Sequence, residues 1–161
     1  MLASGIVLGI AAGWLSGGKL GRLADLEVRW WPLLVLAIGL RVIAPSIGES
    51  LVVWILSFGA IGLVAAVNRD IPGMWLIVAG AIMNLIVVLA NSAMPVDARV
   101  AASVGVAIPA DGLHRELQDG DLLPFLTDVI PVPVVSRVYS VGDAMLAVGG
   151  FWLPFHRMRT S

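Results

Sequence analysis

Five stretches of the chain are apolar and together contain only two charged side chains, Arg41 and Asp143. The stretches cover residues 2–15, 31–44, 51–67, 73–90 and 138–155. A helix needs about 20 mostly apolar residues to cross about 30 Å of hydrocarbon, so the first two would have to thin the bilayer or use interfacial residues. Backbone groups in lipid need internal partners, which favours helices. The predicted fold is an all-α membrane protein, a bundle of about five transmembrane helices.

The composition supports this class and excludes several others. Of the 161 residues, 59% are hydrophobic and 13% charged, whereas soluble domains carry roughly a quarter charged residues. A net charge of −1 excludes a nucleic-acid binder held by bulk electrostatics. The lack of cysteine excludes disulfides and thiolate metal sites, and both histidines lie outside the apolar stretches, where they could not ligate a membrane haem. We expect membrane lipids as partners, no nucleic acid, no metal and no cofactor.

Basic residues between the stretches predict the orientation in the membrane. One side would hold Lys19, Arg22, Arg29, Arg69, Arg157 and Arg159, and the other side Arg99, Arg115 and Arg137. Short cytoplasmic loops carry the excess of lysine and arginine. The N-terminus is therefore expected outside and the C-terminus in the cytoplasm.

The longest segment outside the stretches is the loop of residues 91–137, on the expected outer side. Its prolines exclude one long helix, although a short helix is expected over residues 111–118. A loop this long is usually either functional or disordered, and its own apolar content favours order. We expect one integral membrane domain over residues 1–161 with an ordered outer loop, and we look for chemistry in that loop.

A glycine recurs at every fourth position of the first stretch, at Gly5, Gly9, Gly13 and Gly17. This spacing keeps the glycines on one helix face, where the missing side chains let another backbone approach closely. Two interpretations are open. The face packs against another helix of the same chain, or it docks a second membrane protein.

The charged residues within apolar sequence need partners or a function. A charge at the bilayer centre costs roughly 2.5–3.5 kcal/mol, and a salt bridge between Arg41 and Asp143 is the simplest interpretation. The alternative involves Asp128, which lies in the apolar run before the last stretch. If Asp128 faces Asp143, the two carboxyl groups would share one proton, the arrangement that aspartic proteases use.

Two asparagines, Asn84 and Asn91, lie two turns apart on one face of the fourth stretch. A buried amide in a membrane usually forms a hydrogen bond with a neighbouring helix, and lining a polar pocket is the alternative. Asn91 is the better pocket candidate because it lies at the outer end, beside residues 94–96.

Four segments carry a resemblance to a known family: GGKLGRLADLEVRWWPLLVLAIGLR, NSAMPV, FLTDVIPVP and YSVGDAMLAVGG. They resemble an uncharacterised family of small multi-pass bacterial membrane proteins, a domain of unknown function. The resemblance covers nearly the whole chain. It implies a multi-pass topology in the bacterial cytoplasmic (inner) membrane and no particular activity.

Residues 126–149 are also similar to the end of lipoprotein signal peptidase (signal peptidase II). In that enzyme, an aspartate in an apolar loop precedes a final helix that opens with an N-x-A-D-type motif. The resemblance implies that Asp128 and Asp143 are catalytic. Ser140 stands where that family has asparagine, and its N-x-x-D-R stretch has no clear counterpart here.

Two functions are compatible with these features. The preferred hypothesis is a non-enzymatic accessory or scaffold subunit of a larger membrane protein assembly, because the chain is small and its first helix is lined with glycine. Its partners would be other membrane protein subunits. The alternative is an aspartate-type membrane hydrolase, or a lipid- or peptide-binding protein, built on Asp128 and Asp143. Arg41, Asn91 and Ser140 would then bind the substrate.

Overall fold

The computed structural model describes residues 1–47 and 51–160, and the side chains of residues 41, 42 and 44–47 lie outside that description. The described part is mostly helical, as the sequence predicts. In chain order its elements are α1 (Leu2–Leu15), η1 (Leu20–Leu23), α2 (Trp31–Ile47), α3 (Leu51–Val67), α4 (Met74–Asn91), β1 (Met94–Val96), α5 (Ala98–Ser103), β2 (His114–Glu116), η2 (Pro124–Leu126), β3 (Ile130–Val132), η3 (Pro133–Val135), β4 (Arg137–Tyr139) and α6 (Val141–Arg159).

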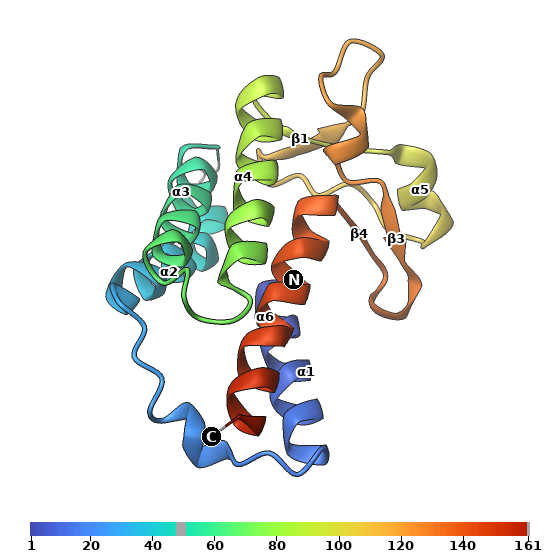
Figure 1. Cartoon of the computed structure of the whole chain (residues 1–161). Coiled ribbons are helices and arrows are strands. Elements are labelled where there is room, and N and C mark those ends of the chain that lie inside the picture. Colours follow the sequence, from blue (N-terminus) through green and yellow to red (C-terminus); the bar gives the residue numbers. More distant parts are fainter. Residues whose placement is uncertain (48–50, 161) are drawn as a thin grey trace.

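The long helices stand side by side in the spatial order α2, α3, α4, α6, α1 (Figure 1). The chain therefore returns on itself, and α6 lies between α1 and α4. The loop between α4 and α6 gathers at one end of this row, together with the start of α6. The segment that contains η1 and the end of α6 lie at the other end.

Helix length limits how many elements could cross a membrane. Within the described residues, α4 is the one helix that is both long enough and apolar enough to cross a membrane. Helix α1 has 14 residues, which reach about 21 Å at 1.5 Å per residue, and α3 has 17 residues. Helix α6 has 19 residues, but it carries an aspartate in its first turn and a histidine and two arginines in its last. The predicted bundle of five spans is therefore not supported.

Helices α1 and α6 approach closely because glycines remove the side chains between them. A Cβ atom on Gly5 would collide with the backbone carbonyl of Ala147, and one on Gly9 would collide with the carbonyl of Phe151. The glycine face that sequence analysis singles out thus lies inside the molecule, against the last helix.

The later glycines of the series have different surroundings. Gly13 lies against the side chain of Met158, whose carbonyl accepts a hydrogen bond from the backbone N–H of Lys19 at 3.0 Å. Gly17 has a φ of +81° and nothing within 4 Å of a Cβ position. Glycine adopts that φ without strain, so Gly17 belongs to the turn that ends α1 rather than to the packed face.

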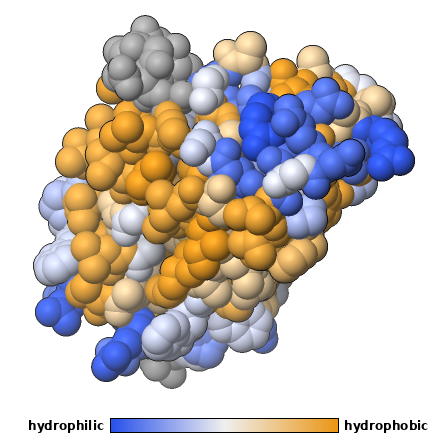
Figure 2. Space-filling model, turned by 90° about the horizontal axis from the view of Figure 1, so that it is seen from above, coloured by the Kyte–Doolittle hydropathy of each residue, from blue (hydrophilic) through white to orange (hydrophobic). Residues whose placement is uncertain are grey.

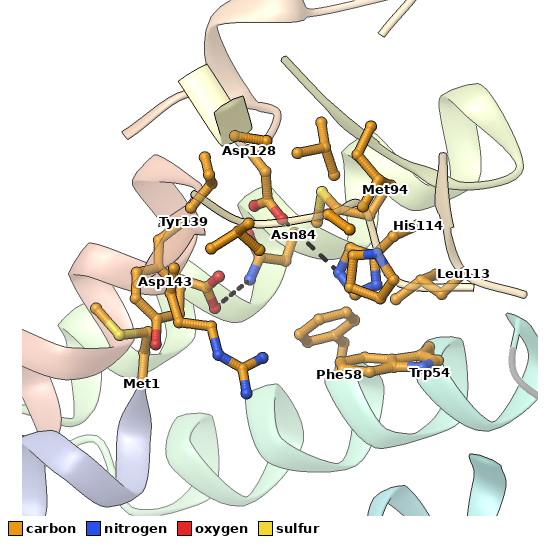
Figure 3. A pocket seen from close by; sticks show the side chains of 18 residues that line it. Met1, Trp54, Phe58, Asn84, Met94, Leu113, His114, Asp128, Tyr139 and Asp143 are labelled. Carbon is orange, nitrogen blue, oxygen red and sulfur yellow. Dashed lines mark hydrogen bonds and ion pairs between the residues drawn. The ribbon is translucent and has the colours of Figure 1, made fainter. Parts of the chain in front are cut away.

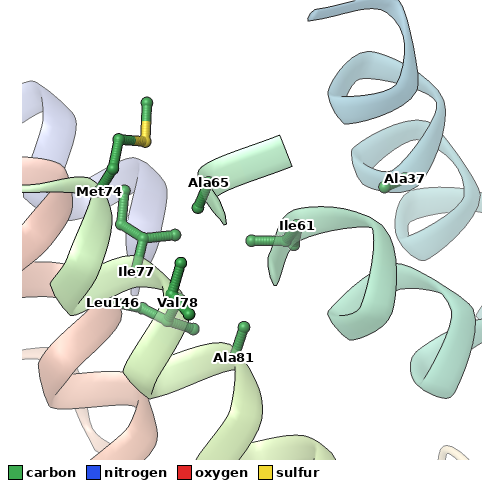
Figure 4. Packing of buried hydrophobic residues seen from close by; sticks show 8 residues of the cluster. All are labelled: Ala37, Ile61, Ala65, Met74, Ile77, Val78, Ala81 and Leu146. Atoms are coloured by element: carbon green, nitrogen blue, oxygen red, sulfur yellow. The ribbon is translucent and has the colours of Figure 1, made fainter. Parts of the chain in front are cut away.

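Buried apolar side chains fill the space between the helices (Figure 4). One cluster joins α2, α3, α4 and α6 and consists of Ala37, Ile61, Ala65, Met74, Ile77, Val78, Ala81 and Leu146. A second cluster joins α3 and α4 to the loop and consists of Phe58, Val87, Val88, Met94 and Leu113. The second cluster holds the loop against the helices.

The loop is ordered by two small sheets. Strand β1 pairs in parallel with β2, and β3 pairs with β4 in antiparallel register. The helix predicted over residues 111–118 is wrong, because residues 114–116 instead pair with the edge of β1. The last helix begins at Val141 rather than at residue 138, because residues 137–139 pair with β3.

Candidate functional site

A cavity of about 200 Å³ lies between α3, α4, the start of α6 and the loop (Figure 3). Its ionisable and amide side chains are Asn84, His114, Asp128, Arg137, Tyr139 and Asp143. Its apolar walls include Trp54, Phe58, Met94, Val96, Val106, Ile108 and Leu113. Polar groups that converge in an apolar cavity are the usual mark of a binding or catalytic site.

Strand β1 positions two of these polar groups. It pairs with β2 so that His114 lies opposite Met94, and its other edge bridges Asp128, which lies opposite Val96. The backbone N–H of Asp128 donates to the carbonyl of Pro95 at 3.0 Å. Alternate residues of a strand share a face, so Met94 and Val96 face the cavity together, and their partners His114 and Asp128 face it with them.

Asp128 is a buried acid with an unpartnered oxygen. Its Oδ1 has no hydrogen-bond partner among the described residues, and its Oδ2 lies 3.7 Å from Nε2 of His114. Burial, together with the negative charges of Asp143 and Asp111, raises the pKa of Asp128 to about 8. Asp128 therefore carries a proton at neutral pH and can act as an acid.

Asp143 is held by a ring of hydrogen bonds at the start of α6. Its Oδ1 accepts from Nδ2 of Asn84 at 3.2 Å, and Asn84 Oδ1 accepts from the hydroxyl of Ser140 at 2.8 Å. Ser140 is the N-cap of α6, and its Oγ accepts from the backbone N–H of Asp143 at 3.0 Å. An N-cap of this kind satisfies a free amide of the first turn, so one serine orders both the helix and the site.

A close crossing of α4 and α6 sets the position of Asn84. A Cβ atom on Gly142 would meet Oδ1 of Asn84, and one on Gly80 would meet the carbonyl of Gly142. Only glycine at these two positions lets the helices come this near. The crossing brings the amide of one helix to the carboxylate of the other.

His114 is a site residue that sequence reasoning missed. Its Nδ1 lies 2.7 Å from Oδ2 of Asp111, and its ring meets the ring of Trp54 edge to face at 5.9 Å. Burial raises the pKa of Asp111, but hydrogen bonds from the backbone and side chain of His114 lower this pKa below its usual value. The only local signal is the Asp-Gly-x-His spacing of residues 111–114, which suits an Asx turn.

The structure brings some predicted site residues together and separates others. Asp128 and Asp143 line the same cavity and point toward the space beside Asn84 (Figure 3). Ser140 supports that site through its hydrogen bonds to Asn84 and to the backbone of Asp143. Asn84 lines the cavity. Asn91 does not line it, and its role as a substrate-binding residue stays a prediction. Its Oδ1 accepts from the backbone N–H of Leu122 at 2.8 Å, and its Nδ2 donates to the carbonyl of Leu122 at 3.0 Å.

Two further predictions concern Arg41 and bound metal. The side chain of Arg41 lies outside the described residues, so its salt bridge to Asp143 stays a prediction. Within the described residues, the carboxylate of Asp143 accepts a hydrogen bond from the amide of Asn84. Among the residues whose placement is described, no group of three or more histidine and acidic side chains is arranged to hold a metal ion.

Comparison with known proteins gives one match. The sequence profile of a family of unknown function (DUF5317) matches residues 25–155. No curated protein and no solved structure matches the chain. The expected resemblance of residues 126–149 to signal peptidase II is not shown by these comparisons.

Proposed function

The chain belongs to DUF5317, a family of unknown function, and from the geometry of its cavity we propose that it is a membrane-embedded hydrolase that uses Asp128 and Asp143 as an acid–base pair. One observation carries the proposal. Asp128 is buried in the cavity wall with an unpartnered oxygen, and a second carboxyl group lines the same cavity. A buried polar atom without a protein partner in such a place is open to a water molecule or a substrate.

The membrane location is part of the proposal. Large apolar side chains are exposed on all five long helices, among them Val7, Leu8, Val35, Leu36, Val52, Leu56, Leu63, Ile82, Leu89, Val148 and Trp152. Figure 2, viewed from the end of the molecule that carries the loop, shows a broad hydrophobic surface between a large hydrophilic area on one side and scattered hydrophilic residues along the opposite edge. Contiguous apolar surface of this kind marks contact with lipid or protein. The shorter helices would cross a locally thinned bilayer of the bacterial cytoplasmic membrane.

The position of the cationic side chains supports an orientation with the cavity outside. Arg157 and Arg159 lie in the last turn of α6, at the end away from the cavity. Arg22 joins them there, since its Nη1 donates to the carbonyl of Met158 at 2.9 Å. Cytoplasmic segments carry the excess of basic residues, so this end would face the cytoplasm.

The two carboxyl groups have different roles in the proposed reaction. Asp128 is protonated at neutral pH because its pKa is about 8, which suits a general acid. Asp143 lies in the first turn of α6, where the helix end favours negative charge, and it accepts the amide N–H of Asn84. Asp143 is therefore the base.

Hydrolysis by this pair consumes one water molecule and returns both acids to their starting state. Asp143 takes a proton from the water as the water oxygen attacks the carbonyl carbon, and Asp128 donates its proton to the carbonyl oxygen. A tetrahedral diol results. When it collapses, the bond to the leaving group breaks, Asp143 gives its proton to that group, and Asp128 recovers a proton from the hydroxyl.

The cavity walls favour a substrate with an apolar group next to the scissile bond. Trp54 and Phe58 of α3 form one wall, and Val106 and Ile108 of the loop also line the cavity. A volume of about 200 Å³ accommodates a small side chain and a water molecule, since a water occupies about 30 Å³. We therefore propose an amide or ester of a membrane-borne, apolar molecule as the substrate.

The test measures hydrolysis without assuming a particular substrate. The purified full chain in mild-detergent micelles is incubated in ¹⁸O-water with two probe sets, peptides that contain an apolar segment and lipid esters. Hydrolysis places one ¹⁸O atom in each new carboxyl group, which mass spectrometry detects. Asp128→Asn and Asp143→Asn should each lower the rate at least 100-fold, because each removes a proton-transfer group.

Two controls make the outcome decisive. Asp119→Asn changes an exposed aspartate of the same loop and should leave the rate unchanged. Thermal unfolding of each variant shows whether it folds. Equal rates in wild type and both site variants, or no ¹⁸O incorporation with either probe set, would overturn the proposal.

An accessory subunit is the second candidate, and the position of α2 favours it. Helix α2 packs mainly against α3 at the edge of the row, and Val35, Leu36 and Ile38 on it are exposed. Purification from the native membrane with native mass spectrometry distinguishes the candidates. A stoichiometric partner polypeptide supports the subunit, and a lone chain argues against it.

A further inference from the structure

The proposed acid, Asp128, lies beside a second pair of residues, His114 and Asp111. We propose that Asp111 and His114 form a positioning couple for Asp128, in which Asp111 fixes the tautomer of His114 so that its bare Nε2 faces Asp128 and holds the acid's proton on Oδ2. This inference rests on the proposed function, because it concerns how Asp128, the acid of that site, is kept protonated. It assigns a role to two residues that the aspartate pair alone does not use.

The couple is built as a unit within one short turn. Oδ1 of Asp111 accepts the backbone N–H groups of Leu113 at 3.0 Å and His114 at 2.9 Å. Its other oxygen, Oδ2, is thereby turned to Nδ1 of His114 at 2.7 Å. The ring of Trp54 fixes the imidazole from a third direction, and the pairing of β2 with β1 fixes its backbone.

The chemistry of Asp111 determines which imidazole nitrogen carries the proton. Burial raises the pKa of Asp111, but the hydrogen bonds from His114 and Leu113, together with the charge interaction with His114, lower it below its usual value. At neutral pH Asp111 is therefore a carboxylate, which only accepts hydrogen bonds. Nδ1 of His114 must then be the donor. In the neutral ring Nε2 is left as an acceptor, and it is Nε2 that lies 3.7 Å from Oδ2 of Asp128.

The acceptor and the acid are complementary. Asp128 holds a proton at neutral pH and needs an acceptor for it, and a bare Nε2 is one. The separation of 3.7 Å is longer than a hydrogen bond, and such contacts in empty sites often tighten when a substrate binds. An Asp–His couple holds the imidazole tautomer in the same way in serine proteases, where the group served is a hydroxyl.

The couple also links the buried acid to solvent. The exposed fractions of the side chains are 23% for Asp111, 18% for His114 and 8% for Asp128. The more exposed imidazole therefore lies between the buried acid and Asp111, which is the most exposed of the three. The other ionisable residues that line this cavity are Asp143, Arg137, Tyr139 and Met1, which carries an amino group on its backbone nitrogen.

Nitrogen NMR of the imidazole tests the couple without any substrate. The chain has two histidines, so His156→Gln, in the last turn of α6, leaves one imidazole to observe. The sample is the full chain, ¹⁵N-labelled, in detergent micelles at pH 7. We expect a neutral ring with the proton on Nδ1 in this background.

Asp111→Asn should move that proton to the other nitrogen. The amide oxygen can still accept the two backbone N–H groups, but an NH₂ group then stands where Oδ2 was. Nδ1 must accept from it, and the proton goes to Nε2. The matched control Asp119→Asn removes the same charge from the same loop at an exposed position and should leave the tautomer unchanged.

Labelling of Asp128 gives the second measurement. A diazo reagent esterifies protonated carboxyl groups, and peptide mass spectrometry shows the pH at which labelling of Asp128 falls by half. We expect about 8 in the wild type and a lower pH in Asp111→Asn, where a negative charge is lost and Nε2–H now donates to the carboxylate. An unchanged midpoint would show that neither the charge of Asp111 nor the tautomer of His114 acts on Asp128, and it would overturn the couple.

The outcomes separate the two proposals. A proton on Nε2 in the wild type, a doubly protonated ring at pH 7, or a tautomer that Asp111→Asn does not change would overturn the couple, whatever the hydrolysis assay shows. Failure of hydrolysis with the expected tautomer and midpoint would overturn the proposed function and leave the couple standing.

Discussion

Asp128 turns its two oxygens to different surroundings. Oδ2 faces the imidazole of His114, whereas Oδ1 is buried and has no partner among the described residues. Removing a carboxyl group from water favours its neutral form. The proton on Asp128 is therefore bound more tightly in the folded chain than in the unfolded chain, which couples the site to stability.

Asp128→Asn is expected to flatten the pH dependence of stability. The pKa of Asp128 is about 8 in the folded chain and near 3.8 for a free side chain. Between these values the folded state holds a proton that the unfolded state releases, so wild-type stability falls as the pH rises. The side chain of asparagine does not ionise in this pH range, so the variant lacks this contribution. Thermal unfolding in micelles from about pH 4 to about pH 8 measures both slopes.

The control for this experiment is a carboxyl group outside the cavity. Asp119→Asn should keep the wild-type slope because Asp119 is exposed. An Asp128→Asn slope equal to that of the wild type would mean that Asp128 ionises as freely in the folded chain as in the unfolded one.

At the residue scale, the sequence identifies the two acids better than it identifies the groups that hold them. Asp128 and Asp143 stand out because each is a charge in apolar sequence. Asn84 and Asn91 give the same signal, since both are amides on one helix face. Which of them reaches the cavity depends on where the loop returns, and Asn91 is used to hold the backbone of Leu122. That is a tertiary contact with no local pattern.

At the scale of the elements, two glycine contacts determine how α6 packs. On one side Gly5 and Gly9 admit the backbone of α6, and on the other Gly80 of α4 meets Gly142. Close backbone approach of this kind is how small residues stabilise helix pairs in membranes. The fit leaves no room for an added methyl group, so the helix positions that define the site are strictly determined.

Gly9→Ala is expected to lower the unfolding free energy by about 1–3 kcal/mol, the usual cost of overpacking. The added methyl group would collide with the carbonyl of Phe151, and backbone cannot move aside as a flexible side chain does. Thermal or denaturant unfolding of the purified variant in micelles measures the change.

A second glycine in a helix provides the matched control. Gly59 in α3 has nothing within 4 Å of a Cβ position, so Gly59→Ala should be neutral or stabilising by up to about 1 kcal/mol through helix propensity. Equal effects of the two substitutions would show that α1 and α6 separate easily.

The elements differ in how far the sequence predicts them. The long apolar stretches are helical except at the start of the last one, where residues 138 and 139 belong to β4, because a continuous apolar run of that length is a strong signal. The strands of the loop have three residues each, which is too short for an alternating pattern to show. Strand β2 forms because Met94 N–H and Val96 carbonyl offer partners at Leu113 and Leu117, and nothing within residues 111–118 reveals those partners.

At the scale of the whole molecule, charge and hydropathy divide the surface. The helices present apolar side chains outward, and the cavity and the basic end of α6 lie at opposite ends of the row (Figure 1). Composition favours an apolar environment, because 59% hydrophobic residues exceed what a small core can bury. It does not indicate how many helices are long enough to span a bilayer, and α1, α2 and α3 are shorter apolar helices than a full span requires.

Single introduced cysteines should report the orientation, because the chain contains none of its own. Asp119→Cys lies in the loop and Thr160→Cys follows α6, both at exposed positions. In intact cells, a maleimide that does not cross membranes should modify the first and not the second. Permeabilised cells, in which both should react, provide the control, and the reverse pattern in intact cells would contradict the proposed orientation.

The contact between α1 and α6 has a consequence for biosynthesis. The glycine face of α1 leaves the ribosome before the helix that it packs against, which is made only after the whole loop. Closing so long a segment is entropically costly and comes late. Asp143 lies in that helix. A nascent chain therefore already contains Asp128 and His114 while the proposed base, Asp143, is still missing. Catalytic competence would thus arise only once α6 has been made and packed, and copies that stop before α6 would lack the proposed base.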